Sequence, residues 1–493
     1  MSGRIADPAL ARKISSAEDA AAMIADGDNV GMSGFTGAGH PKAVPTALAD
    51  RIAAGDRLRI GVWTGAGTAP ELDGALAAVD GIGLRLPYQS DPVQRTKINT
   101  GAMEYLDLHI AHVAPMARHG ALGHLDVAVI EVAGITPAGE LIPATSVGNN
   151  DTWLQLADRV ILEVNSWHSE NLDGVHDICC GNGAPIPITA PGDRVGVPHL
   201  HCPADKVIAV VETHAPEGNG AFTPPDAASR RIAEHVLDFL CAEVAAGRIP
   251  PTLPPLQSGV GNVANAVLAG LQDGPFDRLT AYTEVISDGM LALIDSGTMV
   301  VASATSLSLS TEAIERFRAG DYRDTVVLRP AEISNHPEVV RRLGVIAMNS
   351  MIEADIYGNI NSSHVLGSQM MNGIGGSGDF ARNGYLSMFV TPSTAKHGAV
   401  STIVPMVSHV DHTEHDVDVI VTEQGLADLR GLSPKQRARR IIERCAHPDF
   451  APRLADYFGR ALRFSPGQHT PHLLDEALSW HTRYLAEQTM RQQ

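Results

Sequence analysis

At 493 residues the chain is too long for one hydrophobic core and should divide into two or three domains. Hydrophobic residues make up 44% and charged residues 19%, a balance that is ordinary for a folded globular enzyme and excludes an intrinsically disordered chain. The formal net charge of -19 repels phosphate backbones, so we expect no nucleic-acid partner.

Apolar runs and cysteines bear on where the protein works. No uninterrupted apolar run reaches the length of a membrane span, and residues 1–13 lack the apolar segment of a secretory signal. The five cysteines have no framework spacing, which favours reduced thiols. We therefore expect a cytoplasmic protein that has no membrane partner.

The first predicted elements form one unit of helix, strand, loop, helix and strand. The first helix covers 16–24, the strand 29–32, the glycine-rich loop 33–41, the second helix 43–54 and the second strand 56–63. Short apolar runs at 127–132, 159–164 and 206–211 are typical of buried parallel strands. Strands that alternate with helical segments indicate an α/β fold.

The same order of elements returns in the second half of the chain. It comprises a helix over 228–246, a loop over 256–262, a helix over 264–271 and a strand that opens at 277. In both halves Ser-Gly precedes the loop and Asp-Arg-Leu opens the strand. This weak repeat predicts two open α/β domains of related topology. The turn-rich stretch 215–225 is the expected linker, so we assign residues 1–220 to the first domain and 221–493 to the second.

Shorter elements fill the rest of the second domain. A hairpin is expected from 344–356 into 360–365, and a second strand pair from 401–407 and 417–422, joined by a polar loop. Helices are expected over 434–444 and near 474–491.

The stretch 279–288 places one carboxylate at an unusual point. β-Branched and aromatic side chains predict a strand that Ser287-Asp288-Gly289 stops, and a short apolar helix follows over 290–294. Glu284 then lies at the carboxyl end of a strand, at the edge of an open α/β sheet where ligand crevices form. From this stretch alone, a surface or helix-capping glutamate is the more common alternative.

Two glycine-rich stretches are candidate anion-binding loops. Residues 259–264 fit G-x-G-x-x-A, but four prolines at 250–255 crowd the strand that a dinucleotide fingerprint requires. Loop amides that open a helix still favour phosphate or an oxyanion, with a tight packing loop as the alternative. Residues 372–380 can aim amides at developing charge, or form a mobile turn. Lys396 is a candidate phosphate contact, although exposed lysines are common.

Histidines and carboxylates at 409–416 invite a metal site. Their spacing matches no helical two-histidine motif, and the segment must join two strands, so a hydrogen-bonded polar loop is favoured. His199, His201 and Cys202 are too few and too close together for a zinc site. We predict no metal.

Five motifs together carry a family resemblance. They are Ser258-Gly259-Val260-Gly261-Asn262, Tyr282-Thr283-Glu284-Val285, Glu332-Ile333-Ser334-Asn335-His336-Pro337-Glu338, Gly375-Gly376-Ser377-Gly378-Asp379-Phe380 and Val421-Thr422-Glu423-Gln424-Gly425. The chain resembles, over nearly its whole length, the acetyl-CoA hydrolase/transferase family of class I CoA-transferases. Within that family it looks most similar to the bacterial succinyl-CoA:acetate and propionyl-CoA:succinate transferases.

The resemblance implies two domains with the NagB/CoA-transferase α/β fold, usually in a homodimer, with the active site between them. Glu284 matches the catalytic glutamate, which carries the acyl group as an anhydride and then CoA as a thioester. Val260 and Gly376 match the oxyanion-hole positions, and Asn335 and Glu423 match a polar pair near the glutamate. The matching CoA-binding positions are Gly259, Val260, Gly261, Asn262, Val263, Asn372, Gly376 and Lys396.

The function that the resemblance implies is transfer of CoA from an acyl-CoA to a small carboxylate such as acetate, propionate or succinate. The CoA thioester is a substrate, and no permanently bound cofactor is expected. A glutamate is ionised at neutral pH, so this chemistry requires no general base. An acetyl-CoA hydrolase would use the same glutamate with water as the acceptor, and a ligand-binding regulator or an NAD-dependent oxidoreductase are further alternatives. Family members carry Thr-Gly-Ala-Ser where this chain has Thr64-Gly65-Ala66-Gly67, which leaves the acyl preference open.

Overall fold

The computed structural model describes residues 3–181, 183–217, 224–259 and 261–492. The chain folds into two compact units. Unit 1 comprises Met1–Phe222 and Thr280–Leu343, and unit 2 comprises Thr223–Leu279 and Gly344–Gln493. The units therefore cut the chain at more places than the single boundary expected after residue 220, and the segment that carries Glu284 belongs to unit 1.

Unit 1 is built on a mainly parallel sheet of order β4-β3-β2-β1-β5-β7-β8, with β6 antiparallel to β5. The strands are β1 Asn29–Met32, β2 Ile60–Trp63, β3 Ile82–Leu86, β4 Glu104–Tyr105, β5 Val127–Ile135, β6 Leu141–Pro143, β7 Arg159–Asn165 and β8 Val207–Thr213. Every residue of β5 is buried, as expected for a central parallel strand that is covered on both faces. The apolar runs predicted as strands are β5, β7 and β8.

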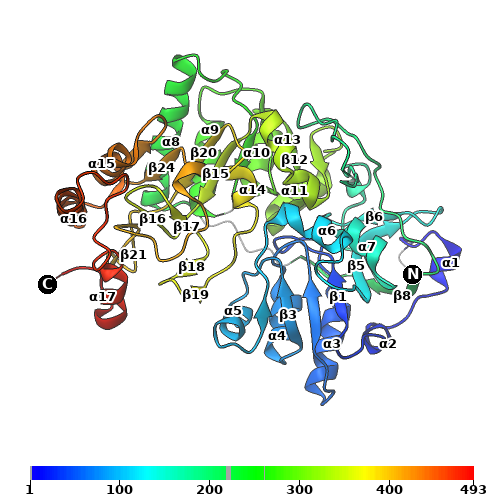
Figure 1. Cartoon of the computed structure of the whole chain (residues 1–493). Coiled ribbons are helices and arrows are strands. Elements are labelled where there is room, and N and C mark those ends of the chain that lie inside the picture. The colour runs from blue at the N-terminus through cyan, green and yellow to red at the C-terminus, as the bar shows by residue number, and fades with distance from the viewer. Residues whose placement is uncertain (1–2, 182, 218–223, 260, 493) are drawn as a thin grey trace. The chain divides into compact units, whose positions relative to one another are not determined.

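Helices cover this sheet and bury its apolar side chains. They are α1 Pro8–Ala11, α2 Ala17–Ala22, α3 Ala43–Ala53, α4 Ala75–Ala78, α5 Pro92–Asn99, α6 Ile110–Arg118 and α7 Asn150–Leu156, with a π-turn at Pro70–Gly74 and a 3-10 turn at Glu170–Leu172. The Ser16 side chain caps α2 by accepting from the Asp19 amide at 3.0 Å, as the Ser-x-x-Asp pattern predicts. In Figure 1, α3, α4 and α5 follow one another along the blue part of the sheet.

The second part of unit 1 carries Glu284. Its strands are β10 Leu279–Tyr282, β12 Met299–Ala304 and β14 Val326–Leu328, in the order β14-β12-β10, and a parallel pair of β11 Val285–Ser287 and β13 Ser306–Ser308. Its helices are α10 Asp288–Asp295, α11 Thr311–Ala319, α12 Ala331–Ser334 and α13 Pro337–Leu343. The continuous strand predicted over 279–286 is wrong. It breaks at Thr283–Glu284, because the chain leaves the sheet of β10 there and pairs with β13 in a different sheet.

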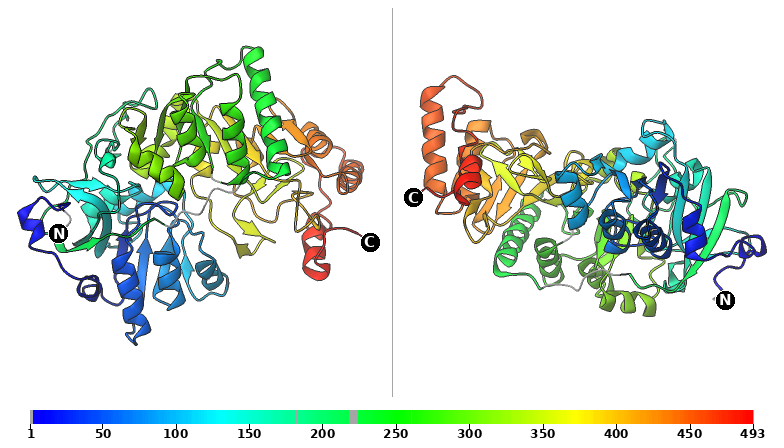
Figure 2. Two further views of the ribbon diagram at one scale, coloured as in Figure 1. Left: turned by 180° about the vertical axis from the view of Figure 1, so that it is seen from behind. Right: turned by 90° about the horizontal axis from the view of Figure 1, so that it is seen from below.

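Unit 2 contains strands in the order β9-β15-β20-β24-β25, of which the first four run parallel and the last antiparallel. They are β9 Leu256–Ser258, β15 Ile346–Ser350, β20 Leu386–Val390, β24 Val419–Thr422 and β25 Gly425–Asp428. The helices α8 Ala227–Ala245 and α9 Asn262–Gln272 pack side by side, as the left view of Figure 2 shows in green. The partial orders β14-β12-β10 and β9-β15-β20-β24 match β4-β3-β2 and β1-β5-β7-β8, as the internal repeat predicts.

Short strands and a helical cluster complete unit 2. The strand β16 Glu353–Asp355 lies between β17 Ile360–Asn361 and β23 Ile403–Val404, and two small hairpins are formed by β18 His364–Val365 with β19 Gln369–Met370 and β21 Thr394–Ala395 with β22 Val400–Ser401. The predicted pairing of 401–407 with 417–422 is wrong: β23 pairs with β16, whereas β24 pairs with β20. Both segments are apolar enough to be strands, but pattern alone does not choose a partner.

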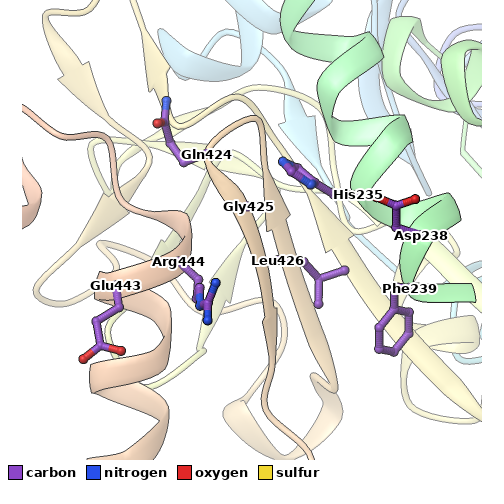
Figure 3. Close-up of a pocket in the computed structure, with 8 residues that line it drawn as sticks. All are labelled: His235, Asp238, Phe239, Gln424, Gly425, Leu426, Glu443 and Arg444. Carbon is purple, nitrogen blue, oxygen red and sulfur yellow. The ribbon is translucent and has the colours of Figure 1, made fainter. Parts of the chain in front are cut away.

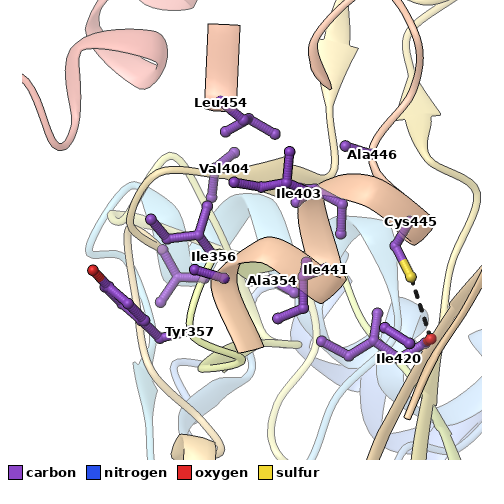
Figure 4. Packing of buried hydrophobic residues seen from close by; sticks show 14 of the residues in the cluster. Ala354, Ile356, Tyr357, Ile403, Val404, Ile420, Ile441, Cys445, Ala446 and Leu454 are labelled. Atoms are coloured by element: carbon purple, nitrogen blue, oxygen red, sulfur yellow. Dashed lines mark hydrogen bonds between the residues drawn. The ribbon is translucent and has the colours of Figure 1, made fainter. Parts of the chain in front are cut away.

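The C-terminal helices share one buried apolar cluster with these strands (Figure 4). They are α15 Pro434–Cys445, α16 Ala451–Phe464 and α17 Ser479–Glu487, and the shorter α14 Ser377–Ala381 and a 3-10 turn at Glu414–Asp416 precede them. The Cys445 thiol lies in this cluster and donates to the Ile420 carbonyl at 3.3 Å. All five cysteines are free. In the part of the chain that the structure describes, no helix combines the length and the apolar character needed to cross a membrane.

Candidate active site

Glu284 lies in the turn between β10 and β11, and its backbone is hydrogen-bonded to the segment at Thr305 and Ser306. Its carbonyl accepts hydrogen bonds from the amides of Thr305 at 3.0 Å and Ser306 at 3.2 Å. Its carboxylate Oε1 accepts from Asn335 Nδ2 at 3.0 Å. The structure therefore brings together Glu284 and Asn335, two predicted site residues that lie 51 positions apart.

The carboxyl group of Glu284 has a perturbed pKa. Burial raises this pKa from 4.5 to about 7, and the hydrogen bond from Asn335 acts in the opposite direction because it stabilises the ionised form. At neutral pH this carboxyl group is therefore only partly ionised, which corrects the expectation of full ionisation. A carboxylate that titrates near neutrality is a common property of functional sites.

The segment that carries Asn335 is anchored from two sides. Tyr282 Oη, on β10, donates to the Ile333 carbonyl at 2.5 Å. The Arg118 guanidinium forms two hydrogen bonds with the Glu332 carboxylate, one of them 2.9 Å from Nη1 to Oε1. Such paired bonds fix geometry as well as charge. Sequence reasoning did not identify Arg118, because nothing in its local sequence indicates a partner 214 positions away.

An N-terminal loop lies beside β13, the strand that pairs with β11. Ser306 Oγ and Ser308 Oγ, on β13, donate to the carbonyls of Phe35 and Thr36, each at 3.2 Å. Phe35 also belongs to a small buried cluster that includes Val285, the residue after Glu284. The other members of this cluster are Ala66, Ile110 and Ala331, with Tyr88 packed against them. Phe35 and Thr36 of the glycine-rich loop 33–41, which was predicted only as part of the fold, therefore pack next to the turn that carries Glu284.

Gly67 marks the departure from the family motif. A Cβ atom at this position would lie 2.9 Å from Ser90 Oγ and 3.5 Å from the ring of Tyr88. Any side chain at position 67 therefore requires Ser90 to move. Gly67 has no hydroxyl at the position where the family motif has a serine. The nearest hydroxyl to a Cβ at Gly67 is that of Ser90.

In unit 2, the predicted residues lie at one edge of the parallel strands. Gly259 follows β9, Ser393 follows β20 and Glu423 follows β24, and the carboxyl ends of parallel strands share one edge. Lys396 lies in the turn of the β21–β22 hairpin that comes after β20. The Glu423 carboxylate accepts from the Ser393 amide at 2.7 Å and from its hydroxyl. Burial alone would raise the pKa of Glu423, but these hydrogen bonds hold it below the usual value.

The glycine loops show how the other predicted residues are placed. Val260 lies outside the described residues. Gly261 has a φ of 118° and precedes α9, which begins at Asn262 and includes Val263. Asn372 lies just before the second glycine loop, at the position where that loop leaves β19.

Gly376 caps the N-terminus of α14 and is buried. Its amide donates to no residue that the structure describes. A buried amide without a protein partner is uncommon and is available to a ligand oxygen. Lys396 is exposed, and its ammonium forms no ion pair with the described residues.

Two groups of histidines and carboxylates lie close enough to hold an ion. They are His364, His409 and Asp411, and Glu131, His168 and Glu217. Asp411 accepts from the amides of Ser362 at 2.6 Å and Ser363 at 2.9 Å, which is the hydrogen-bonded loop predicted for 409–416. In the second group, the Lys42 ammonium lies 2.7 Å from Glu131 and already neutralises its charge. Glu217 Oε2 and His168 Nδ1 in the second group have no hydrogen-bond partner among the described residues, but Lys42 and His168 already pair with the Glu131 carboxylate. We assign neither group to a metal.

A surface hollow of ≈ 440 Å³ lies beside the turn between β24 and β25 (Figure 3). It is lined by His235, Asp238, Phe239, Gln424, Gly425, Leu426, Glu443 and Arg444. None of the predicted site residues is among them, although Gln424 adjoins Glu423. Acidic and basic side chains both line the hollow, so it does not select for one sign of ligand charge.

Comparison with known proteins decides the family. The description "Acetyl-CoA hydrolase/transferase N-terminal domain" matches residues 7–186, and "Acetyl-CoA hydrolase/transferase C-terminal domain" matches residues 314–458. The chain is 47% identical to the succinyl-CoA:acetate CoA-transferase of Clostridium kluyveri, over 99% of this chain and 92% of that protein. The chain belongs to the acetyl-CoA hydrolase/transferase family. This confirms the resemblance drawn from the five motifs.

Other members of the acetyl-CoA hydrolase/transferase family differ in the activity that they are named for. The propanoyl-CoA:succinate CoA transferase of Escherichia coli is 45% identical over 96% of this chain and 98% of its own. An acetyl-CoA hydrolase of Schizosaccharomyces pombe is 41% identical over 100% of this chain and 98% of its own. The family therefore includes proteins named as transferases and proteins named as hydrolases.

Solved structures confirm the α/β fold of this family member. RipA from Yersinia pestis aligns with a TM-score of 0.72 at 25% identity, over 91% of this chain and 97% of that chain. A 4-hydroxybutyrate CoA-transferase from Porphyromonas gingivalis aligns with a TM-score of 0.64 at 21% identity, over 91% of this chain and 98% of that chain. The fold is thus shared with proteins of low sequence similarity.

Proposed function

We propose that the protein is an acyl-CoA:carboxylate CoA-transferase that moves CoA between short-chain acids such as acetate, propionate and succinate. The observation that carries the proposal is the half-buried carboxylate of Glu284, with its raised pKa and its hydrogen bond from Asn335, in a member of this family. The transferase names of two relatives that are 47% and 45% identical support the substrate class.

Glu284 acts as a nucleophile in this mechanism. Its carboxylate attacks the thioester carbonyl, the carbon–sulfur bond breaks, and CoA leaves as a thiolate while an acyl-glutamyl anhydride forms. The thiolate then attacks the glutamyl carbonyl of the anhydride, which releases the first carboxylate and leaves a glutamyl-CoA thioester. The acceptor carboxylate repeats these two steps in reverse order. No step requires an external proton or a metal ion.

Backbone amides stabilise the charge that develops at each attack. The amide of Gly376 has no partner among the described residues and is the proposed donor in unit 2, together with that of Val260. One such donor is typically worth about 3 kcal/mol of barrier. The loop at Gly259, Gly261, Asn262 and Val263, with Asn372 and Lys396, is proposed to bind CoA. Asn335 and Glu423 are the proposed polar residues near the nucleophile, and the protein is proposed to work as a cytoplasmic homodimer.

Hydrolysis is the second candidate, because relatives in fungi are named acetyl-CoA hydrolases. Both activities pass through the same glutamate and differ only in the final acceptor. We expect CoA release from acetyl-CoA or succinyl-CoA to be at least about 100-fold slower without a carboxylate acceptor than with one, because a transferase must exclude water from its anhydride. The measurement is thiol release with and without added acetate or succinate. Release at full speed without an acceptor would assign the protein as a hydrolase.

The Asn335 hydrogen bond should tune the pH dependence of exchange. Only the ionised carboxylate of Glu284 is nucleophilic, so kcat/KM should rise with pH through a midpoint near the pKa of about 7. Asn335→Ala removes a hydrogen bond that lowers this pKa. The midpoint is therefore expected to move to higher pH, with the largest loss of rate below neutrality. A midpoint that stays in place, or moves to lower pH, would contradict the assignment of Asn335.

A further inference from the structure

We propose that His412 is a positioning residue for the Gly376 amide, acting through the hydroxyl of Ser377. The inference rests on the proposed function, in which this amide stabilises the oxyanion. It gives a role to part of the 409–416 loop, which neither the proposed mechanism nor a metal site uses. The two residues lie 35 positions apart and both belong to unit 2.

A chain of two hydrogen bonds links His412 to the glycine loop. His412 Nε2 lies 3.0 Å from Ser377 Oγ, and Ser377 Oγ lies 2.8 Å from the Ile374 carbonyl oxygen. A carbonyl only accepts and a hydroxyl has one proton, so Ser377 donates to Ile374. The hydroxyl must then accept from His412, which places a proton on Nε2. The direction of both bonds follows from this proton count.

The turn that these bonds close contains the proposed oxyanion donor. The Ile374 carbonyl also accepts from the Ser377 amide at 3.4 Å, so the serine closes the turn with its backbone and its side chain. Between them, Gly375 has a φ of 57° and Gly376 presents its unpartnered amide. Successive glycines restrict the backbone little. The hydrogen bond from the Ser377 hydroxyl to the Ile374 carbonyl therefore restricts the backbone of this turn and fixes the direction of the Gly376 amide.

His412 is itself rigidly placed. Its side chain is 2% exposed, and its ring packs on Phe389 of β20 with centroids 4.8 Å apart. Its backbone is bonded in both directions to Ile360, with the His412 carbonyl accepting at 2.8 Å and its amide donating at 3.1 Å. The imidazole thus connects a central strand of unit 2 to the glycine-rich turn. A flexible side chain at position 412 would not hold the Ser377 hydroxyl in a fixed position.

Two substitutions remove the link from opposite ends. Ser377→Ala and His412→Phe are each expected to lower kcat for CoA exchange by about 10- to 100-fold, less than the roughly 10²- to 10³-fold loss seen when one oxyanion donor is removed, because the Gly376 amide is misdirected and not deleted. The KM values for acyl-CoA and acceptor should stay within about twofold, because the amide contributes mainly in the transition state. The double variant should be no slower than the worse single variant, since both remove one link. His412→Gln, whose amide can donate to Ser377, should recover part of the lost rate.

Matched controls separate positioning from loss of structure. His415→Phe changes an exposed histidine of the same loop and should leave kcat unchanged. Ser377→Ala should leave the melting temperature close to that of the unsubstituted protein, because it removes one partly exposed hydroxyl. Single-turnover mass spectrometry should show the adduct on Glu284 forming more slowly in Ser377→Ala but reaching the same extent. That extent would show that the nucleophile is intact and only its stabilising donor is impaired.

Several outcomes would overturn the inference. A kcat unchanged in both Ser377→Ala and His412→Phe would show that the link does not position the amide. If the two substitutions lower kcat and raise KM by similar factors, the loop has a general structural role. The same conclusion follows if His415→Phe lowers kcat as much as they do. If unsubstituted protein forms no adduct on Glu284 while exchanging CoA, the proposed function itself fails, and this result is distinct from a failure of the His412 link.

Discussion

Glu284→Ala is expected to lower the rate of CoA exchange by roughly 10⁴-fold or more, because it removes the nucleophile on which both covalent intermediates form. In unit 1, the described residue that hydrogen-bonds the Glu284 carboxylate is the neutral amide of Asn335. Glu284→Ala should abolish CoA transfer and acyl-CoA hydrolysis together, because both candidate activities use this glutamate.

Mass spectrometry provides the direct measurement. The unsubstituted protein incubated with acyl-CoA and no acceptor should acquire CoA, or a borohydride-reduced derivative, on the peptide that contains Glu284. Glu284→Ala should acquire none. A labelled peptide elsewhere in the chain, or an alanine variant that exchanges acyl groups at normal speed, would refute the assignment.

Glu284→Gln separates catalytic loss from unfolding. The folded pKa of Glu284, about 7, is above the value of 4.5 expected in the unfolded chain. The unsubstituted protein therefore loses stability as pH rises from about 4.5 through 7, because ionisation is easier in the unfolded state. The neutral glutamine escapes this loss. Its melting temperature, relative to the unsubstituted protein, should rise across that pH window while its activity stays absent.

Asp177→Ala is expected to lower the free energy of unfolding by about 3–5 kcal/mol, since removing one partner of a buried ion pair leaves an uncompensated charge. The side chains of Arg329 and Asp177 are 0% and 1% exposed and contact each other directly. Asp177 also accepts from the Gly196 amide at 2.7 Å, and Arg329 also donates to Ser303 Oγ at 2.8 Å. The pair ties Asp177 and Gly196 to β12 and to the end of β14, two strands of the sheet that contains β10.

An exposed ion pair in the same unit is the matched control. Arg323 and Asp321 form an ion pair at 2.6 Å, but their side chains are 56% and 61% exposed. Asp321→Ala should leave the free energy of unfolding close to that of the unsubstituted protein, because solvent screens such pairs. Urea unfolding of both variants gives the comparison. Equal losses in the two variants would show that burial does not govern the strength of the Arg329–Asp177 pair.

Local patterns in the sequence predicted many elements and the identity of the key carboxylate. Runs of buried apolar residues such as 127–132 indicated β5 before its neighbours were known. The Ser16 cap and the turn that ends the first helix also depend only on residues close in sequence. Glu284 was identified because its motif and four others occur in a fixed order. The assigned roles of these residues remain predictions.

The partners of the strands and the point at which the strand before Glu284 ends depend on contacts between distant segments. The segment 401–407 is a strand by composition, but its partner β16 lies far away in the sequence. The chain breaks its strand at Thr283 and Glu284 because β13 is present to pair with β11. No local pattern contains this information, since strand pairing and register are contacts between distant segments.

The sequence by itself therefore determined the family, the α/β class and which carboxylate to examine, because these depend on residue types in a fixed order. Only the tertiary structure decided that Asn335 donates to Glu284, that Arg118 holds the neighbouring Glu332, and that the carboxyl pKa lies near 7. The physical reason is that a hydrogen bond and a desolvated charge are set by the atoms that surround a group in space. Most of those atoms come from residues far away along the chain.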